Sequence, residues 1–424
     1  MKTRSALLRV FGGFFAALLV VTGALAQTKT PAPSKPRIRC ITAFVRLDRA
    51  TYQPQIVEAA KFLRIAQTTF ESRDFTVQTL RIATQPFPEY TQGLTREQAL
   101  QFFKDLDGLA QMHNVVISIG PAYLSSNDGD AQSELLADAL KNSKALFGSV
   151  YVTSSSGVSW PAIRAAAAIM KKLEDGTVNG EGNFRFAALA SVSQPTPFFP
   201  AAYLTGLGHQ FAVGLESANE VAAAVQDVPD LPTAKRRLID LFFQQASNVE
   251  NVALRIDGER GWTYLGLDLS PAPSKDASIA AAIENISHQP LGSNGTLSAV
   301  GVITAAMKEI GLRKTGFSGV MLPVLEDPVL AQRWNAGLIS LDSLLSYSSV
   351  CGTGLDTIPL PGNATAEQLA HIIGDVATLA VKWNKPLTAR LLPVSGKNAG
   401  QQTEFSDPHL LNATIQPLSG PEPH

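Results

Sequence analysis

The sequence predicts an α/β protein, a closed and mostly parallel barrel of about ten strands surrounded by helices. Short β-branched apolar runs alternate along the chain with longer segments whose apolar residues recur every three to four positions. An open sheet of about ten strands leaves two unpaired edges, which closure into a barrel removes. A doubly wound open sheet is the alternative.

The first two elements show the pattern. Residues 38–45 (IRCITAFV) are a β-branched run, and residues 54–71 follow with Ile56, Ala60 and Leu63 on one helical face. The same reasoning predicts strands at residues 76–82, 115–119, 149–152, 185–190, 249–256, 265–269, 319–324, 349–355 and 389–393. It predicts helices at residues 96–112, 132–146, 160–173, 216–225, 233–245, 278–286, 297–310 and 366–383.

Composition excludes several classes of function. Of the 424 residues, 45% are hydrophobic and 17% are charged, which is too apolar for a disordered chain. The net charge of −1 offers no positive field for non-specific binding to nucleic acid. Two cysteines, Cys40 and Cys351, are too few for a disulfide scaffold or for a zinc site built on cysteine pairs. A Cys40–Cys351 disulfide stays open as an alternative to two free thiols.

The N-terminal residues are typical of a secretory signal peptide. Residues 1–9 are basic, residues 10–25 are almost wholly apolar, and Ala24-Leu25-Ala26 places small residues where a signal peptidase reads. We therefore expect residues 1–26 to be removed by a cut before Gln27, which places the mature protein in the periplasm or outside the cell. The alternative is an uncleaved membrane anchor, for which the apolar stretch is short. We expect no stable membrane span after cleavage.

The rest of the chain is expected to form a single domain. No Pro/Ser-rich linker and no run of like charges interrupts it after Pro36. We expect a flexible leader at residues 27–36, the α/β barrel domain at residues 37–419 and a frayed tail at residues 420–424.

Loops that follow strands hold the reactive groups of α/β proteins, and two such junctions carry acids. In GLDLSPAPS, Asp268 and Ser270 come just after a strand, where they can serve chemistry or cap the next turn. In GVMLPVLED, Glu326 and Asp327 precede a helix that begins near Pro328. Acids in that position favour the helix dipole, so we expect a structural role for this second pair.

Residues 348–363 (SSVCGTGLDTIPLPGN) are the most unusual stretch. Gly352, Gly354 and two prolines predict a fixed, non-helical excursion. Cys351 can act there as a nucleophile or hydrogen-atom relay, or be an inert buried thiol. Asp356 suits a general base or a cation ligand, although an Asx turn explains it equally well.

Arg390 lies in the middle of an otherwise apolar strand in KPLTARLLPVSGK. An unpaired buried guanidinium is costly, so Arg390 faces either a carboxylate, such as Asp268 or Asp356, or an anionic ligand. Glu216 is a lesser candidate for ligand binding that a helix start also explains. His209 is a further lesser candidate.

Several common motifs are missing from the sequence. There is no GxGxxG after a strand, and no GxxxxGK, HExxH, CxxC or GxSxG. Nucleotide, zinc-protease and serine-hydrolase functions therefore lose their usual support. We expect no metal site, and the cofactor, if there is one, is unknown.

Eight segments together are similar to the domain-of-unknown-function 711 family, also called uncharacterised protein family 0210. They are IRCITAF, TPFFPAAY, FAVGLE, GLDLSPAPS, NGTLSAV, GVMLPVLEDPVLAQR, YSSVCGTGLDTIPLPG and KPLTARLLPVSGK. The resemblance covers essentially the whole mature chain. It implies a fold similar to the closed ten-stranded barrel of pyruvate formate-lyase-type glycyl radical enzymes, with VCGTGLD as an interior hairpin loop. Cys351 then lies where a radical enzyme needs its thiol.

The chain departs from those patterns in three places. Asn363 stands where the family often has an acid, and Ser395 stands where it often has proline. The C-terminal glycyl motif, RVxGY or a close variant, is missing from residues 395–424. The resemblance therefore implies no glycyl radical chemistry, and it brings no known reaction.

Our leading hypothesis is an extracytoplasmic enzyme of hydrolase or lyase type that acts on a small anionic metabolite in the barrel mouth. The expected catalytic residues are Cys351, Asp356 and Asp268, and the expected substrate-binding residues are Arg390, Ser270, Glu216, Gly352 and Gly354. The alternative is a binding protein that performs no reaction. A third hypothesis is a structural scaffold, and the sequence is compatible with a homo-oligomer.

Overall fold

A computed structural model describes residues 35–122, 129–193 and 195–419. The predicted signal peptide, most of the predicted leader and the predicted tail lie outside the described residues, and the predicted domain bounds stay a prediction.

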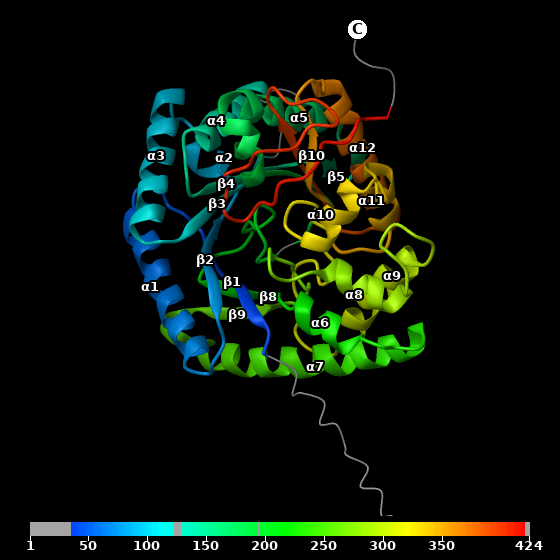
Figure 1. Cartoon of the computed structure of the whole chain (residues 1–424). Coiled ribbons are helices and arrows are strands. Elements are labelled where there is room, and N and C mark those ends of the chain that lie inside the picture. The colour runs from blue at the N-terminus through cyan, green and yellow to red at the C-terminus, as the bar shows by residue number, and fades with distance from the viewer. Residues whose placement is uncertain (1–34, 123–128, 194, 420–424) are drawn as a thin grey trace, which may run out of the picture. The chain divides into compact units, whose positions relative to one another are not determined.

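A nine-stranded, mostly parallel sheet forms the centre of the fold (Figure 1). Its order is β10-β11-β7-β4-β3-β2-β1-β8-β9, and only the β1–β8 and β7–β11 pairs are antiparallel. The strands are β1 (Arg37–Val45), β2 (Val77–Thr84), β3 (Val116–Ala122), β4 (Leu146–Tyr151), β7 (Phe186–Ala190), β8 (Gln210–Glu216), β9 (Thr263–Asp268), β10 (Gly354–Pro361) and β11 (Leu387–Val394). Strands β5 (Thr153–Ser154) and β6 (Gly157–Val158) form a separate ribbon.

Helices surround the sheet, which confirms the α/β class. They are α1 (Tyr52–Glu71), α2 (Pro88–Thr91), α3 (Arg96–Met112), α4 (Gly129–Lys141), α5 (Trp160–Gly176), α6 (Ala218–Ala224), α7 (Leu231–Ile256), α8 (Ile279–Ser287), α9 (Thr296–Glu309), α10 (Pro328–Asn335), α11 (Leu341–Tyr347) and α12 (Ala366–Trp383). Helix α1 packs on β1 and β2, α7 on β9 and α12 on β11. None of these helices, within the part of the chain that is described, has the length and apolarity to cross a bilayer.

Successive side chains of each strand point to opposite faces of the sheet. Leu80 and Ile82 of β2 face the helices and belong to the main hydrophobic core. Thr79 and Arg81 of the same strand line a cavity on the opposite face, as does Phe147 of β4. Two smaller apolar clusters cover this inner face with side chains from the loops that follow β7 and α9. The inner face therefore carries polar groups among aromatic rings.

Four stretches differ from the prediction, and the first is the strand predicted at residues 349–355, which begins only at Gly354. Residues 249–256 are not a strand but the last turns of α7, because Val249, Val252, Ala253 and Ile256 are buried at three- to four-residue spacing. Residues 210–216 form β8, for which no strand is predicted, and the helix predicted at residues 216–225 begins only at Ala218 as α6. Residues 319–324 form no named strand.

Residues 348–363 are non-helical as predicted, but the interior hairpin expected there is wrong. The second half of this stretch is β10, an edge strand that runs parallel to β11. Pro359 and Pro361 fit this place, because an edge strand tolerates residues that lack a backbone donor.

Residues 313–324 contact both edges of the sheet. Arg313 O accepts a hydrogen bond from Leu267 N of β9 (2.9 Å), and Val324 N donates to Asp356 O of β10 (3.1 Å). Both bridges to the edge strands, Leu267 with Lys314 and Pro323 with Asp356, are parallel.

Candidate functional site

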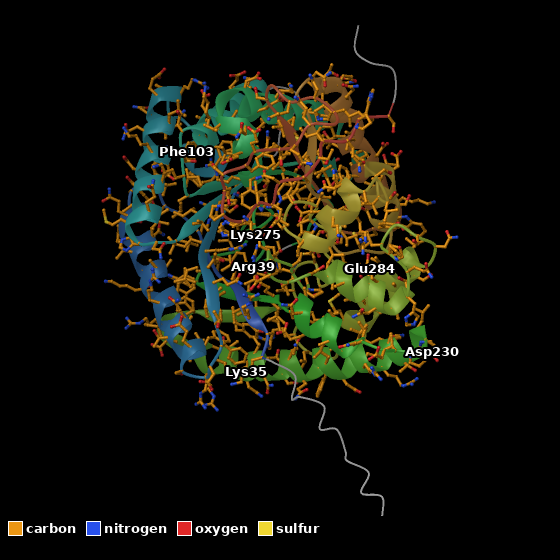
Figure 2. All side chains as sticks on the ribbon, viewed as in Figure 1. Lys35, Arg39, Phe103, Asp230, Lys275 and Glu284 are labelled. Atoms are coloured by element: carbon orange, nitrogen blue, oxygen red, sulfur yellow. The ribbon has the colours of Figure 1, made fainter. Side chains whose placement is uncertain are left out.

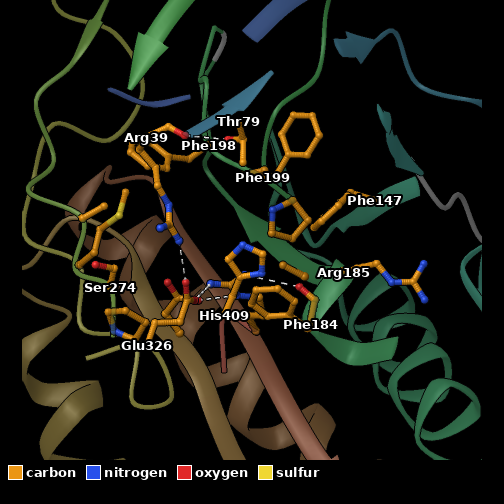
Figure 3. Close-up of a pocket in the computed structure, with 18 of the residues that line it drawn as sticks. Arg39, Thr79, Phe147, Phe184, Arg185, Phe198, Phe199, Ser274, Glu326 and His409 are labelled. Carbon is orange, nitrogen blue, oxygen red and sulfur yellow. Dashed lines mark hydrogen bonds and ion pairs between the residues drawn. The ribbon is translucent and has the colours of Figure 1, made fainter. Parts of the chain in front are cut away.

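A cavity of about 640 Å³ opens on the inner face of the sheet (Figure 3). Its apolar wall includes five phenylalanines and one methionine: Phe147, Phe184, Phe198, Phe199, Phe317 and Met321. Its charged lining residues are six basic ones, Arg39, Arg81, Lys144, Arg185, Lys275 and Arg390, and four acidic ones, Asp276, Glu326, Asp356 and Asp407. The lining thus has an excess of positive charge, in a chain whose net charge is −1.

Two arginines and two acids form a chain of ion pairs at one wall of the cavity. Arg390 donates from Nε to Asp356 (2.6 Å) and from Nη2 to Glu326 (2.5 Å). The other oxygen of Glu326 binds Arg39 (3.1 Å), and Figure 3 shows the Arg39 guanidinium pointing at this carboxylate. The carboxylate of Glu326 therefore joins two buried strands, β1 and β11.

The chain of ion pairs continues to Glu216 at the end of β8. Its carboxylate binds Arg39 (3.0 Å) and Arg37 (2.7 Å), and it also accepts hydrogen bonds from Gln78 (2.7 Å) and Ser274 (3.2 Å). These partners fully occupy Glu216, which is buried and does not appear among the described residues that line the cavity.

Local backbone irregularities aim these side chains. Asp356 and Thr357 both stand opposite Arg390, because the register shifts between Leu355 and Ile358. This is a β-bulge, which re-aims side chains next to functional sites. A similar shift between Ile38 and Cys40 interrupts the pairing of β1 with β8 just where Arg39 meets Glu216.

Arg390 is held as a cation by its neighbours. Burial lowers its pKa, the charges of Asp356 and Glu326 raise it, and the net direction is upward. Its guanidinium also lies 4.9 Å from the centre of the Phe184 ring. Since both Arg390 and its acidic partners are buried, each is needed to offset the desolvation of the other.

Arg81 differs from Arg39 and Arg390. Its Nε donates to Thr79 Oγ1 (3.0 Å), and its guanidinium carbon lies 5.1 Å from the centre of the Phe199 ring. No acid among the described residues lies within ion-pair distance of it. Burial therefore lowers the pKa of Arg81, and the Coulombic effects of the other charges do not reverse this direction. Arg81 is a buried cation that faces the cavity without a carboxylate partner.

His409 and Asp407 form a hydrogen-bonded pair on the cavity wall. Asp407 Oδ1 lies 3.0 Å from His409 Nδ1 and also accepts from the His409 backbone N–H (2.8 Å). Burial raises the pKa of Asp407, the hydrogen bonds from His409 lower it, and the net direction is downward. A charged Asp407 favours a proton on Nδ1, which leaves Nε2 to accept one. The imidazole ring stacks on the Phe184 ring, and the two ring centres are 6.2 Å apart.

The position of His409 follows from the C-terminal segment, which folds back over the sheet after β11 (Figure 1). Leu411 N donates to Leu325 O (2.7 Å), and Trp334 Nε1 donates to Thr414 O (2.7 Å). Figure 2 shows Arg39 and Lys275, which line the cavity, in the central part of the view, whereas Asp230 at the start of α7 lies at its margin.

Asp268 and Ser270 organise a loop instead of lining the cavity. The Asp268 carboxylate accepts from Phe317 N (2.7 Å), Ser318 N (2.9 Å), Ser270 N (3.0 Å) and Ser270 Oγ (2.7 Å). Burial raises the pKa of Asp268, and these hydrogen bonds oppose that rise. The structural alternative for both residues, turn formation, fits this geometry.

Cys351, Gly352 and Gly354 also lie outside the described cavity lining. Cys351 is fully buried, and its sulfur accepts from Gly354 N (3.4 Å). A Cβ on Gly352 would come within 2.5 Å of the Gly319 backbone, so glycine is required here for a close approach of two backbone segments. Both cysteines are free. Of the predicted site residues, only Asp356 and Arg390 meet at the cavity.

Four residues that were not predicted as ligands complete the site: Arg39, Arg81, Asp407 and His409. The first two carry the signal that identified Arg390, a basic residue inside an apolar strand. Glu326 belongs to the chain of ion pairs, whereas Asp327 has the expected structural role and caps α10.

His209 is half-exposed and lies 3.8 Å from Glu58. No group of three or more His, Cys, Asp or Glu placed to hold a metal ion occurs at residues 35–122, 129–193 and 195–419.

Comparison with known proteins gives a consistent result. The family described as "Uncharacterised ACR (DUF711)" matches residues 32–407. A UPF0210 protein of Pyrobaculum islandicum is 34% identical over 341 residues, which are 76% of this chain and 74% of that protein. A UPF0210 protein of Pyrobaculum arsenaticum is 33% identical over the same shares of the two chains. One from Listeria monocytogenes serotype 4b is 26% identical over 395 residues, which are 87% of this chain and 85% of its own.

Proposed function

The chain belongs to the DUF711 family of uncharacterised proteins, and we propose that it is an enzyme of hydrolase or lyase type that acts on a small anionic metabolite. The observation that carries this proposal is the cavity lining, which combines an excess of basic residues with the His409–Asp407 pair. A positive, partly apolar pocket with one proton-transfer group is the arrangement that acid–base catalysis on an anion requires.

His409 is the proposed proton carrier. In a hydrolase, Nε2 takes a proton from the attacking water and returns it to the leaving group. In a lyase, Nε2 takes a proton from carbon and the leaving group departs. Asp407 positions the ring and stabilises its charged form, while Asp356 and Glu326 hold Arg390 in the wall.

The proposal predicts that His409→Gln lowers turnover by at least about 100-fold, because general acid–base catalysis contributes that much or more. The measurement is mass-spectrometric detection of product from a panel of small esters and hydroxy acids that carry a carboxylate. His209→Gln is the matched control, since His209 lies away from the cavity, and it should retain full turnover. Equal turnover in wild type and His409→Gln would remove His409 from the mechanism.

A binding protein without catalysis is the second candidate. Three of the four acids that line the cavity, Asp276, Glu326 and Asp356, are held in ion pairs with arginines. These acids already serve to hold arginines in place, which leaves the His409–Asp407 pair as the proposed proton-transfer group among the described lining residues. Saturable binding of panel compounds without any turnover would favour this candidate.

We also infer that residues 313–324 close the sheet into a barrel. This segment runs parallel to both edge strands, and its backbone hydrogen-bonds to each. With it, the group β8, β9, β10 and β11 becomes a continuous parallel set that faces the set β1, β2, β3, β4 and β7. Such closure explains why the inner face encloses a cavity.

An extracytoplasmic location remains part of the proposal, and it rests on the sequence of residues 1–26. We predict that the protein recovered from the native host begins at Gln27. Intact-mass and N-terminal analysis of that material tests this prediction. An N-terminus that retains Met1 in the cytoplasmic fraction would contradict it.

A further inference from the structure

We propose that Arg81 binds the carboxylate of a small aromatic acid whose ring lies among the phenylalanines of the cavity. This inference rests on the proposed function and names its substrate class. Arg81 differs from the neighbouring arginines in its partners. Arg39 and Arg390 each bind two carboxylates, whereas within the described residues the Arg81 side chain donates a hydrogen bond from Nε alone.

The geometry of Arg81 suits a carboxylate. Thr79 Oγ1 occupies Nε, and that hydroxyl in turn donates to Arg39 O (2.7 Å), so the guanidinium is fixed in orientation. Neither Nη group has a partner among the described residues. These two parallel donors match the two oxygens of a planar carboxylate.

The walls beside Arg81 suit an aromatic body. The Phe199 ring lies against the guanidinium, and it contacts the Phe147 ring with their centres 5.2 Å apart. Phe198, Phe317 and Met321 form a second apolar group on the same cavity. A flat ring attached to the carboxylate would bury apolar surface against both groups, because aromatic rings favour tilted or offset stacking.

Arg185 is the main competitor for the anion. Its Nη1 donates to Ser143 Oγ (3.0 Å) and to Leu146 O (3.4 Å), and burial lowers its pKa. It has no ion pair with the acids that the structure describes. Arg185 uses Nη1 for both protein acceptors and keeps Nε and Nη2, so its remaining donors are as numerous as those of Arg81. The contact of the Arg81 guanidinium with the Phe199 ring distinguishes the two arginines and favours Arg81 for an aromatic acid.

Isothermal titration calorimetry of the full protein with benzoate, acetate, benzamide and inorganic phosphate tests the inference. We expect benzoate to bind at least tenfold more tightly than acetate and phosphate, and the neutral benzamide to bind at least tenfold more weakly than benzoate. Arg81→Met should weaken benzoate at least tenfold, and Arg81→Lys, which keeps the charge but not the fork, should weaken it less. Arg236→Met on the exposed side of α7 is the control and should bind as wild type.

The outcomes separate this inference from the proposed function. Benzoate binding that survives Arg81→Met but not Arg185→Gln would overturn the assignment of Arg81. Equal affinity for acetate and benzoate would overturn the aromatic class while leaving an anion site. No benzoate binding to wild type at 10 mM (an order-of-magnitude ceiling for a specific site) would overturn the inference entirely. Failure of the proposed function would look different: benzoate would bind through Arg81, yet no panel compound would turn over. Thermal melts of each variant confirm that it is folded.

Discussion

Replacing Arg390 with leucine is expected to lower the free energy of unfolding by about 3–5 kcal/mol. The substitution leaves Asp356 without an ion-pair partner in the described structure, and Glu326 keeps only Arg39. Both carboxylates stay buried, so their desolvation is no longer offset. Urea unfolding followed by tryptophan fluorescence measures the loss.

A matched control is Arg46→Leu, which breaks the ion pair with Glu89. Both of those side chains are almost half exposed, at 46% and 44%, so the solvent already screens the pair. We expect a far smaller loss than for Arg390→Leu. If the two variants lost the same stability, the network of Arg390, Glu326 and Asp356 would not support the fold in the way described.

Asp268→Ala is expected to have the second large effect, a loss of about 3 kcal/mol or more in the free energy of unfolding. The substitution removes the acceptor of three backbone N–H groups, those of Ser270, Phe317 and Ser318. These donors are buried, and each one left unsatisfied costs free energy. Asp268→Asn should lose less, because the amide keeps one of the two acceptor oxygens.

The control for this experiment is Asp230→Ala. Asp230 also accepts a backbone N–H, that of Thr233, but at the exposed start of α7. Its replacement should cost much less than that of Asp268. A native melting temperature for Asp268→Ala combined with lost turnover would contradict the structural role and would support the catalytic role considered from the sequence.

Much of the fold can be predicted from periodicity. The β-branched run at residues 38–45 lies within β1, and the helices predicted at residues 96–112 and 366–383 match α3 and α12. Periodicity fails where one residue type suits two structures. The valines at residues 249 and 252 favour strands by propensity, yet the burial of every third or fourth residue decides for α7.

The candidate site could be predicted only in part. Arg390 stood out because it is a charge in an apolar strand, and its partner Asp356 was among the acids considered. The same signal marks Arg39 and Arg81, but the sequence alone does not show which of the three has no acidic partner. That depends on contacts between strands far apart along the chain.

His409 and Cys351 show the opposite limits. His409 lies in an irregular segment without periodicity, and only the return of that segment over the sheet brings it to the cavity. Cys351 is a candidate nucleophile from the sequence because Gly352 follows it in a stretch rich in glycine and proline. The glycines instead serve close backbone approaches, since a Cβ on Gly354 would come within 2.4 Å of Thr388 O.

The cavity on the inner face of the sheet is proposed to bind a carboxylate through Arg81. The most direct test of this binding is a crystal structure of the protein grown with benzoate. We predict electron density in the cavity with both carboxylate oxygens about 2.8 Å from the two Nη atoms of Arg81. Benzoate bound elsewhere, or in the cavity with its carboxylate turned away from Arg81, would contradict the account.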